Sequence, residues 1–190
     1  MASPTPASPA LKVIETTIPG VLILDPRVFA DARGFFLESY NQRTMAEAGI
    51  HESFVQDNHS FSARQVLRGL HYQIGRPQGK LVRAVVGEIF DVAVDLRQSS
   101  PAFGKWFGTI LSGENHRMLW MPGGIAHGFC VCSENAHILY KATDFYSPEN
   151  ERTILWSDRD LAIQWPLDGE PGISSKDARG VRFRDAVKFG

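Results

Sequence analysis

The stretch KLVRAVVGEIFDVAVDLR, residues 80–97, decides the fold class because it holds two runs rich in valine, isoleucine and phenylalanine. Because β-branched and aromatic residues favour extended backbone, we predict strands over 80–86 and 88–97. The same criteria predict further strands at 21–24, 35–40, 53–56, 66–73, 105–112, 116–122, 126–132 and 137–146. Turns that contain Gly, Pro, Asn or Ser separate many of these runs, and strand spacing of roughly 8–12 residues is typical of antiparallel sandwiches and barrels. The sequence therefore predicts an all-β, jelly-roll-like sandwich or barrel with a few short helices.

The rest of the chain shows little regular patterning. One short helix is predicted near 43–50, where Gly49 closes the helical stretch. Residues 1–12 are biased toward Ala, Ser and Pro, so we predict a disordered tail there and a single domain over 13–190. The segment from Pro166 onward is loop-rich and polar, and we expect it to wrap the edge of a sheet.

Composition narrows the function classes. The 190 residues are 43% hydrophobic and 22% charged, which is ordinary for a globular protein with one substantial core. A net charge of −1 gives no support for nucleic-acid binding, and no apolar run reaches the roughly 18–20 residues that span a membrane. The first ten residues lack the basic start and apolar centre of a signal peptide. Cys130 and Cys132 would lie on one side of a strand, a poor geometry for a mutual disulfide, so we expect a reducing, cytoplasmic setting.

The stretch QVLRGLHYQ, residues 65–73, raises the question of function because Arg68 and His71 interrupt an otherwise apolar strand. Strict alternation of side chains along a strand would place these two residues on opposite faces. A bulge at Gly69 would bring both into one cavity, and glycine inside a strand often marks such a bulge. We therefore predict a bulge at Gly69.

A metal centre is not expected. The spacing Pro122-x-Gly124-x-x-His127 resembles the second motif of the cupins, a jelly-roll superfamily that often binds metal. The first cupin motif carries a His-x-His pair followed by a carboxylate, whereas this chain has His71-x-Gln73 and no carboxylate until Glu88. Since a transition metal normally needs three or more good ligands, we predict no metal centre.

Two interpretations of His71 remain open from the residues alone. Its unperturbed pKa of about 6.5 suits a general base, but a histidine in a strand is also found hydrogen-bonded in a core. The basic residues nearby either form a solvated face or, beside apolar strands, a pocket for an anion. These residues are Arg68, Arg76, Lys80 and Arg83, with Asp91 and Asp95 on the next strand.

Tyr140 presents the same choice. A buried tyrosine usually contributes apolar area and one hydrogen bond. Its phenol can also deliver a proton, with a reference pKa of about 10 that a nearby cation would lower.

Several motifs together resemble the dTDP-4-dehydrorhamnose 3,5-epimerase family, in the right order from about Ile14 to Ala178. The motifs are DARGFFLESYN, FVQDNHS, VLRGLHYQ, QGKLVRAVVGEIFDVAVDLR, PGGIAHGF, LYKATDFYSPENE, ILWSD and SSKDA. The resemblance implies a homodimeric cupin without metal or cofactor. Such an enzyme inverts C3 and C5 of a 4-keto-6-deoxyhexose attached to thymidine diphosphate.

Carried over by motif, the resemblance implies a role for each site residue. His71 would be the general base, Asp177 its partner, Tyr140 the proton donor, and Lys80 a group near the carbonyl oxygen of the sugar. Tyr146 would stack on the thymine, although Phe145 replaces a second tyrosine often found before this turn. The remaining positions would contact sugar or nucleotide: Arg68, His127, Gln56, Asn58, Glu151 and Lys176. Arg33 and Glu38 would reach the site of the neighbouring subunit, so the N-terminal strand region would make the dimer functional.

Three alternatives remain. Relatives with the same base and acid invert C3 only, and the motifs do not separate the two outcomes. A non-catalytic binder of nucleotide sugars is disfavoured because His71, Lys80, Tyr140 and Asp177 occur together. A metal-dependent cupin enzyme is the third.

Overall fold

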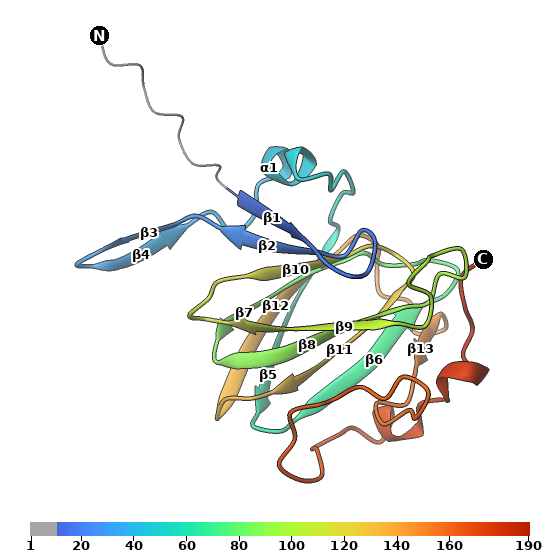
Figure 1. The fold of residues 1–190 in the computed structure, drawn as a ribbon. Coiled ribbons are helices and arrows are strands. Elements are labelled where there is room, and N and C mark those ends of the chain that lie inside the picture. The colour runs from blue at the N-terminus through green and yellow to red at the C-terminus, as the bar shows by residue number, and fades with distance from the viewer. Residues whose placement is uncertain (1–10) are drawn as a thin grey trace.

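The computed structural model, which describes residues 11–190, is a sandwich of two antiparallel sheets (Figure 1). One sheet has six strands in the order β1-β2-β10-β7-β12-β5, and the other has five in the order β13-β6-β11-β8-β9. The six strands are β1 Leu11–Glu15, β2 Leu22–Pro26, β10 Met118–Met121, β7 Lys80–Val86, β12 Asn135–Ala142 and β5 Gln56–Ala63. The five are β13 Glu151–Thr153, β6 Leu67–Gln73, β11 Ile125–Val131, β8 Glu88–Asp95 and β9 Trp106–Ser112. The predicted all-β jelly-roll architecture is confirmed.

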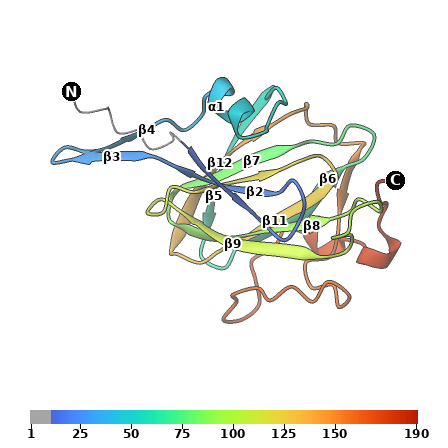
Figure 2. The same cartoon turned by 45° about the horizontal axis from the view of Figure 1, so that its top comes forward.

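Helices are few and short, as predicted. α1 covers Gln42–Glu47, and two 3₁₀ turns cover Asp177–Arg179 and Phe183–Asp185. A separate hairpin of β3 Val28–Asp31 and β4 Gly34–Leu37 extends away from the sandwich, which is clearest in Figure 2.

Three apolar clusters explain the layering. The main core fills the space between the sheets and includes Val82, Leu119 and Ile138. A second cluster covers the outer face of the five-stranded sheet, where residues after β13 pack on it. A third lies on the outer face of the six-stranded sheet beneath α1, around Trp120. Alternation along each strand thus sends one set of side chains inward and the other toward these outer layers.

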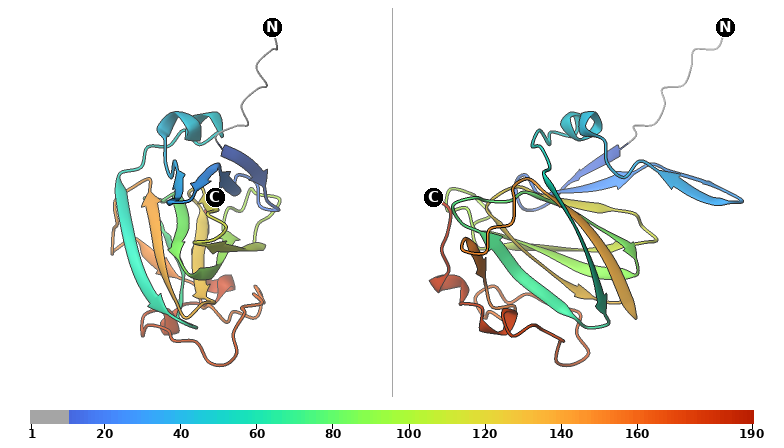
Figure 3. Two further views of the ribbon diagram at one scale, coloured as in Figure 1. Left: turned by 90° about the vertical axis from the view of Figure 1, so that its left-hand side faces the viewer. Right: turned by 180° about the vertical axis from the view of Figure 1, so that it is seen from behind.

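The segment from Pro166 onward wraps the five-stranded sheet, as expected, and Figure 3 shows it running along one side of the sandwich. It is held by isolated bridges of Gly172 to Val66 and of Phe189 to Arg97. This wrapping places the first 3₁₀ turn beside β6.

Some predicted boundaries are wrong. The strand predicted at 53–56 begins only at Gln56 and continues to Ala63. Its sequence, QDNHSFSA, is mostly polar, and it forms because every residue from 56 to 63 pairs with β12. Of the predicted tail 1–12, residues 1–10 lie outside the described residues, whereas Leu11 and Lys12 already belong to β1. The strands β1, β3 and β13 were not predicted from the sequence.

Three further findings concern residues 11–190 only. No helix there has the length and apolar character needed to cross a membrane. No group of three or more His, Cys, Asp or Glu side chains is placed to hold a metal ion. Cys130 and Cys132 are free thiols, the first buried and the second partly buried.

Candidate active site

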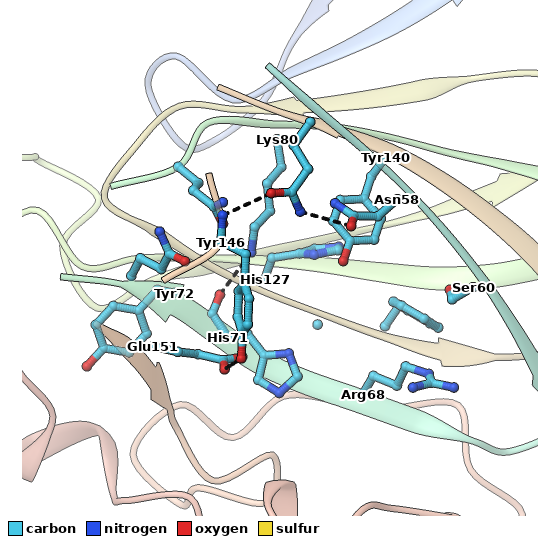
Figure 4. Close-up of a pocket in the computed structure, with 15 residues that line it drawn as sticks. Asn58, Ser60, Arg68, His71, Tyr72, Lys80, His127, Tyr140, Tyr146 and Glu151 are labelled. Carbon is cyan, nitrogen blue, oxygen red and sulfur yellow. Dashed lines mark hydrogen bonds between the residues drawn. The ribbon is translucent and has the colours of Figure 1, made fainter. Parts of the chain in front are cut away.

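A cavity of about 390 Å³ opens between the two sheets, and most of the predicted site residues line it (Figure 4). Both sheets contribute side chains, because alternate residues of each strand point inward. The predicted residues that line it are His71, Tyr140, Lys80, Gln56, Asn58, Arg68, His127, Tyr146 and Glu151.

The predicted bulge at Gly69 is confirmed. His71 lies opposite His127 and Arg68 lies opposite Phe129. Two residues of β6, Gly69 and Leu70, therefore stand opposite one residue of β11, Gly128. Gly69 has φ +112°, and a Cβ there would lie 2.6 Å from the carbonyl oxygen of His127. Only glycine fits this conformation and this close approach. As a result Arg68 and His71 face the same cavity.

His71 forms a dyad with Asp177, as the resemblance implied. Its Nε2 lies 2.6 Å from Oδ1 of Asp177, whose side chain is 4% exposed. Burial disfavours ionisation of this carboxyl, but the hydrogen bond and charge of His71, together with hydrogen bonds from Gly69 and Ser174, outweigh burial, so the pKa of Asp177 is lowered. A carboxylate at Nε2 fixes the hydrogen there and leaves Nδ1 with the lone pair that a base needs. His71 itself is 28% exposed and lines the cavity, so it is not a core histidine.

Lys80 lies on β7, across the cavity from β6. Its Nζ lies 3.4 Å from the carbonyl oxygen of His71, and the residue is buried. Burial lowers the pKa of Lys80 to about 8, and the negative charges of Glu151 and Asp91 limit that fall. The ammonium group of Lys80 therefore loses its proton at a pH much closer to neutral than that of an exposed lysine.

Tyr140 lies on β12, where the cation of Arg68 lowers its pKa as expected, but other contributions outweigh that effect. Burial raises the pKa of the phenol, the charge of Glu151 raises it further, and Arg68 only partly opposes both. A raised pKa keeps the phenol protonated, which is the form that a proton donor requires. Tyr140 and His71 reach the cavity from opposite sheets.

The rim of the cavity is organised by Glu151. The hydroxyl of Tyr146 donates to Glu151 Oε2 at 2.6 Å, and Lys176 forms an ion pair with the same oxygen. The bond to Glu151 is the main reason that the pKa of Tyr146 is raised to about 12. Burial opposes ionisation of Glu151, but Lys176 and Tyr146 hold its pKa below the usual value. Lys176 and Asp177 line a second hollow on the other side of His71 rather than the main cavity.

Two further hydrogen-bonded pairs include residues that line the cavity. Gln56 donates to the side-chain oxygen of Asn58 at 3.0 Å and accepts from the backbone N–H of Tyr146 at 2.9 Å. His127 Nε2 lies 2.7 Å from Oδ1 of Asp91, and both residues are buried.

Sequence reasoning missed several lining residues. Ser60 faces the cavity from β5, and the alternation of Gln56, Asn58 and Ser60 was the signal that could have found it. Gln73 is buried, donates to the carbonyl of Phe145 and accepts from the backbone N–H of Ser147. It holds the turn before β13.

Besides Lys176 and Asp177, the predicted site residues Arg33 and Glu38 do not line the cavity of this chain, and neither do Arg76 and Arg83 of the predicted basic cluster. Arg33 pairs with Asp31 at the tip of the β3–β4 hairpin, and Glu38 accepts from residues at the start of α1. Arg76 pairs with Asp144, and Arg83 points to the outer face of the six-stranded sheet. The suggested cationic pocket therefore reduces to Arg68 and Lys80, because Arg83 alternates with Lys80 along β7 and Arg76 is neutralised nearby.

The fold and the cavity define an acid–base enzyme built on a jelly-roll sandwich. A histidine backed by a carboxylate, a protonated phenol and a buried lysine converge on one space between the sheets. The family model for dTDP-4-dehydrorhamnose 3,5-epimerase matches residues 15–185, and the chain belongs to this family.

Curated relatives and solved structures of similar proteins support this family assignment. The dTDP-4-dehydrorhamnose 3,5-epimerase of Pseudomonas aeruginosa is 60% identical over 180 residues, covering 94% of this chain and 99% of that protein. The Legionella pneumophila epimerase in complex with dTDP-4-keto-L-rhamnose has a TM-score of 0.89 at 50% identity, covering 92% of this chain and 93% of that one. A 3'-monoepimerase of Streptomyces bikiniensis in complex with dTDP has a TM-score of 0.83 at 29% identity, covering 88% and 85%.

Proposed function

We propose that this chain inverts C3 and C5 of dTDP-4-dehydro-6-deoxy-D-glucose to give dTDP-4-dehydro-L-rhamnose. The names of its most similar relatives support this reaction, and the Legionella pneumophila structure holds a 4-keto sugar of this type. Both carbons flank the C4 ketone, so removal of either proton gives an enolate stabilised by the same oxygen.

The observation that carries the proposal is the position of His71 and Tyr140 on facing sheets. Inversion needs a base on one face of the ring and an acid on the other. A sugar ring held between the sheets would present one face to the imidazole and the other to the phenol. Each group is expected to contribute roughly 10²–10⁴-fold.

Lys80 and Asp177 would support this pair. The ammonium group of Lys80 would stabilise the negative charge that develops on the C4 oxygen, a role worth about 3–4 kcal/mol per donor. Asp177 would orient the imidazole of His71 and stabilise the imidazolium that forms when it takes a proton.

The residues around the rim would hold the nucleotide. Tyr146 is 52% exposed at the mouth, where its ring is available to stack on thymine. Arg68 and Lys176 would meet the diphosphate as cations. Polar contacts to the base and sugar would come from Gln56, Asn58, His127 and Glu151.

We further propose a homodimer in which the β3–β4 hairpin enters the neighbouring site. The hairpin exposes Phe29, Phe35 and Phe36, the last at 70%, and extends away from its own sandwich (Figure 2). Its Arg33, with Glu38 beyond it, would reach the neighbour's nucleotide. The two free cysteines support a cytoplasmic setting for the enzyme.

Complementation tests this shared site. Arg33→Ala and His71→Ala homodimers should each be poorly active. After subunit exchange, each mixed dimer contains one site with both native residues, so mixing should restore activity. If it does not, the hairpin does not serve the neighbouring site.

A C3-only epimerase is the second candidate, because the Streptomyces bikiniensis monoepimerase shares the fold. Incubating the enzyme with dTDP-4-dehydro-6-deoxy-D-glucose in deuterated water separates the two. We expect solvent deuterium at both C3 and C5, with conversion to the L-rhamno product. Deuterium at C3 alone would exclude double inversion, and loss of activity on chelation would restore the metal-dependent alternative.

A further inference from the structure

Asp91 carries a buried carboxylate that does not line the cavity. It lies on β8 between Ile89 and Ala93, both of which are fully buried in the main core. Oδ1 contacts His127, but Oδ2 is buried without a hydrogen-bond partner among the described residues. An unsatisfied buried carboxylate oxygen is unfavourable, so its retention in an apolar core calls for a reason.

The neighbourhood of Asp91 supplies that reason. Its partner His127 lines the cavity, and the buried ammonium group of Lys80 lies on the facing sheet. After Glu151, Asp91 is the second negative charge that limits the fall in the pKa of Lys80 caused by burial. Other titratable groups reach this cavity from the remaining elements: His71 from β6, Tyr140 from β12 and Glu151 from β13.

We infer that Asp91 is a positioning residue for the epimerisation: it orients the imidazole of His127 and supplies a buried negative charge for Lys80. The inference rests on the proposed function. Asp91 does not line the cavity, so it acts through its two neighbours rather than on the sugar. Without it, Lys80 would keep Glu151 but lose the second negative charge that opposes its desolvation, so more of the lysine would be neutral near pH 8.

The test is Asp91→Asn, which keeps the size of the side chain and removes its charge. We expect KM to change little and kcat to fall about tenfold or more, approaching the 10²–10³-fold loss seen when an oxyanion donor is removed. The alkaline limb of the kcat profile should move to lower pH by about one unit or more. His127→Gln leaves the negative charge of Asp91 in place, so the alkaline limb of its kcat profile should not move.

The protonation of Lys80 is read without turnover, from the pH titration of its ¹³Cε resonance by NMR in the free enzyme. The titration midpoint should fall in Asp91→Asn. The titration of Lys80 does not depend on the identity of the sugar. If the wild type showed no exchange at C3 and C5, the proposed function would be wrong, but the effect of Asp91 on Lys80 could still be measured.

Asp95→Asn is the matched control. Asp95 is also a buried carboxylate on β8, but it pairs with Arg97 and Ser100. It should lower stability and leave the titration of Lys80 unchanged. A Lys80 midpoint in Asp91→Asn equal to that of the wild type would overturn the inference. If Asp91→Asn does not fold, Asp91→Glu serves instead, because it keeps the negative charge but displaces it. It should shift the Lys80 midpoint by less than one pH unit and still lower kcat. An unchanged kcat in this variant would count against a positioning role for Asp91.

Discussion

Replacing Asp177 by asparagine gives the sharpest test of the proposed dyad. The substitution keeps the shape of the side chain but removes the charge that faces Nε2 of His71 at 2.6 Å. A hydrogen bond to a charged group contributes about 1.5–3 kcal/mol, which corresponds to a factor of about 10–150 in rate if it is realised only when the imidazolium forms. The amide can also donate to Nε2, which would place the lone pair on the wrong nitrogen and add to the loss. We therefore expect kcat to fall at least tenfold.

The assay is the rate of deuterium incorporation at C3 and C5, followed by NMR at saturating substrate. KM should change little, because Asp177 does not line the main cavity. The matched control is Asp168→Asn, a change of the same kind in the same C-terminal segment, where the carboxylate forms an exposed ion pair with Arg64. Exposed pairs contribute roughly 0–1 kcal/mol, so this variant should behave as the wild type. If Asp177→Asn retains kcat within about threefold, less than 1 kcal/mol, the dyad is not catalytic.

The fold of Asp177→Asn must be checked in parallel. Since the pKa of Asp177 is lowered in the folded state, its ionised form stabilises the protein above the pKa of the unfolded chain, and that stability is lost as pH falls through the folded value. The variant should therefore unfold at lower denaturant concentration at pH 7. A circular dichroism spectrum that matches the wild type would show that the kinetic loss is not unfolding.

Three other substitutions test separate parts of the site. Lys80→Met should lower kcat by about 10²–10³-fold. Wild-type activity should fall as pH rises through about 8, where the ammonium group of Lys80 loses its proton. A wild-type profile that stays flat to pH 10 would contradict this role of Lys80. Tyr140→Phe should still exchange substrate protons with solvent but give little inverted product, whereas normal inversion would remove Tyr140 as the acid. Gly69→Ala should cost at least about 2–3 kcal/mol of unfolding free energy, because its Cβ would meet the backbone of Gly128 at 2.6 Å. Gly34→Ala, also at positive φ but with nothing within 4 Å, should cost less, and equal losses would mean that the close approach is unimportant.

The sequence could predict the parts of the fold that depend on local patterning. The runs at 80–86 and 88–97 form strands because their valines and isoleucines fit a buried pleated surface, and Gly69 marks a bulge because no other residue tolerates that backbone. The polar strand β5 could not be predicted in this way. Its hydrogen bonds to β12, more than seventy residues away in the chain, decide its conformation.

The site shows the same division. His71 and its bulge were visible in one stretch, but its partner Asp177 lies 106 residues away and needed the family resemblance. Arg68 lowers the pKa of Tyr140, as expected of a nearby cation, but burial, which depends on the whole fold, raises it more. The orphan oxygen of Asp91 is likewise visible only when the sheets are packed.

The two sheets divide the proposed chemistry between them. The five-stranded sheet carries His71 and His127, each backed by a buried carboxylate, and the six-stranded sheet carries Tyr140 and Lys80. An apolar core of interdigitated side chains fixes the distance between the sheets, so base and acid are held apart by packing rather than by a flexible loop. A rigid spacing is what two successive inversions require. In the proposed mechanism both C3 and C5 would pass between His71 and Tyr140, and a nucleotide held at the rim would be the anchor about which the sugar turns from one position to the other.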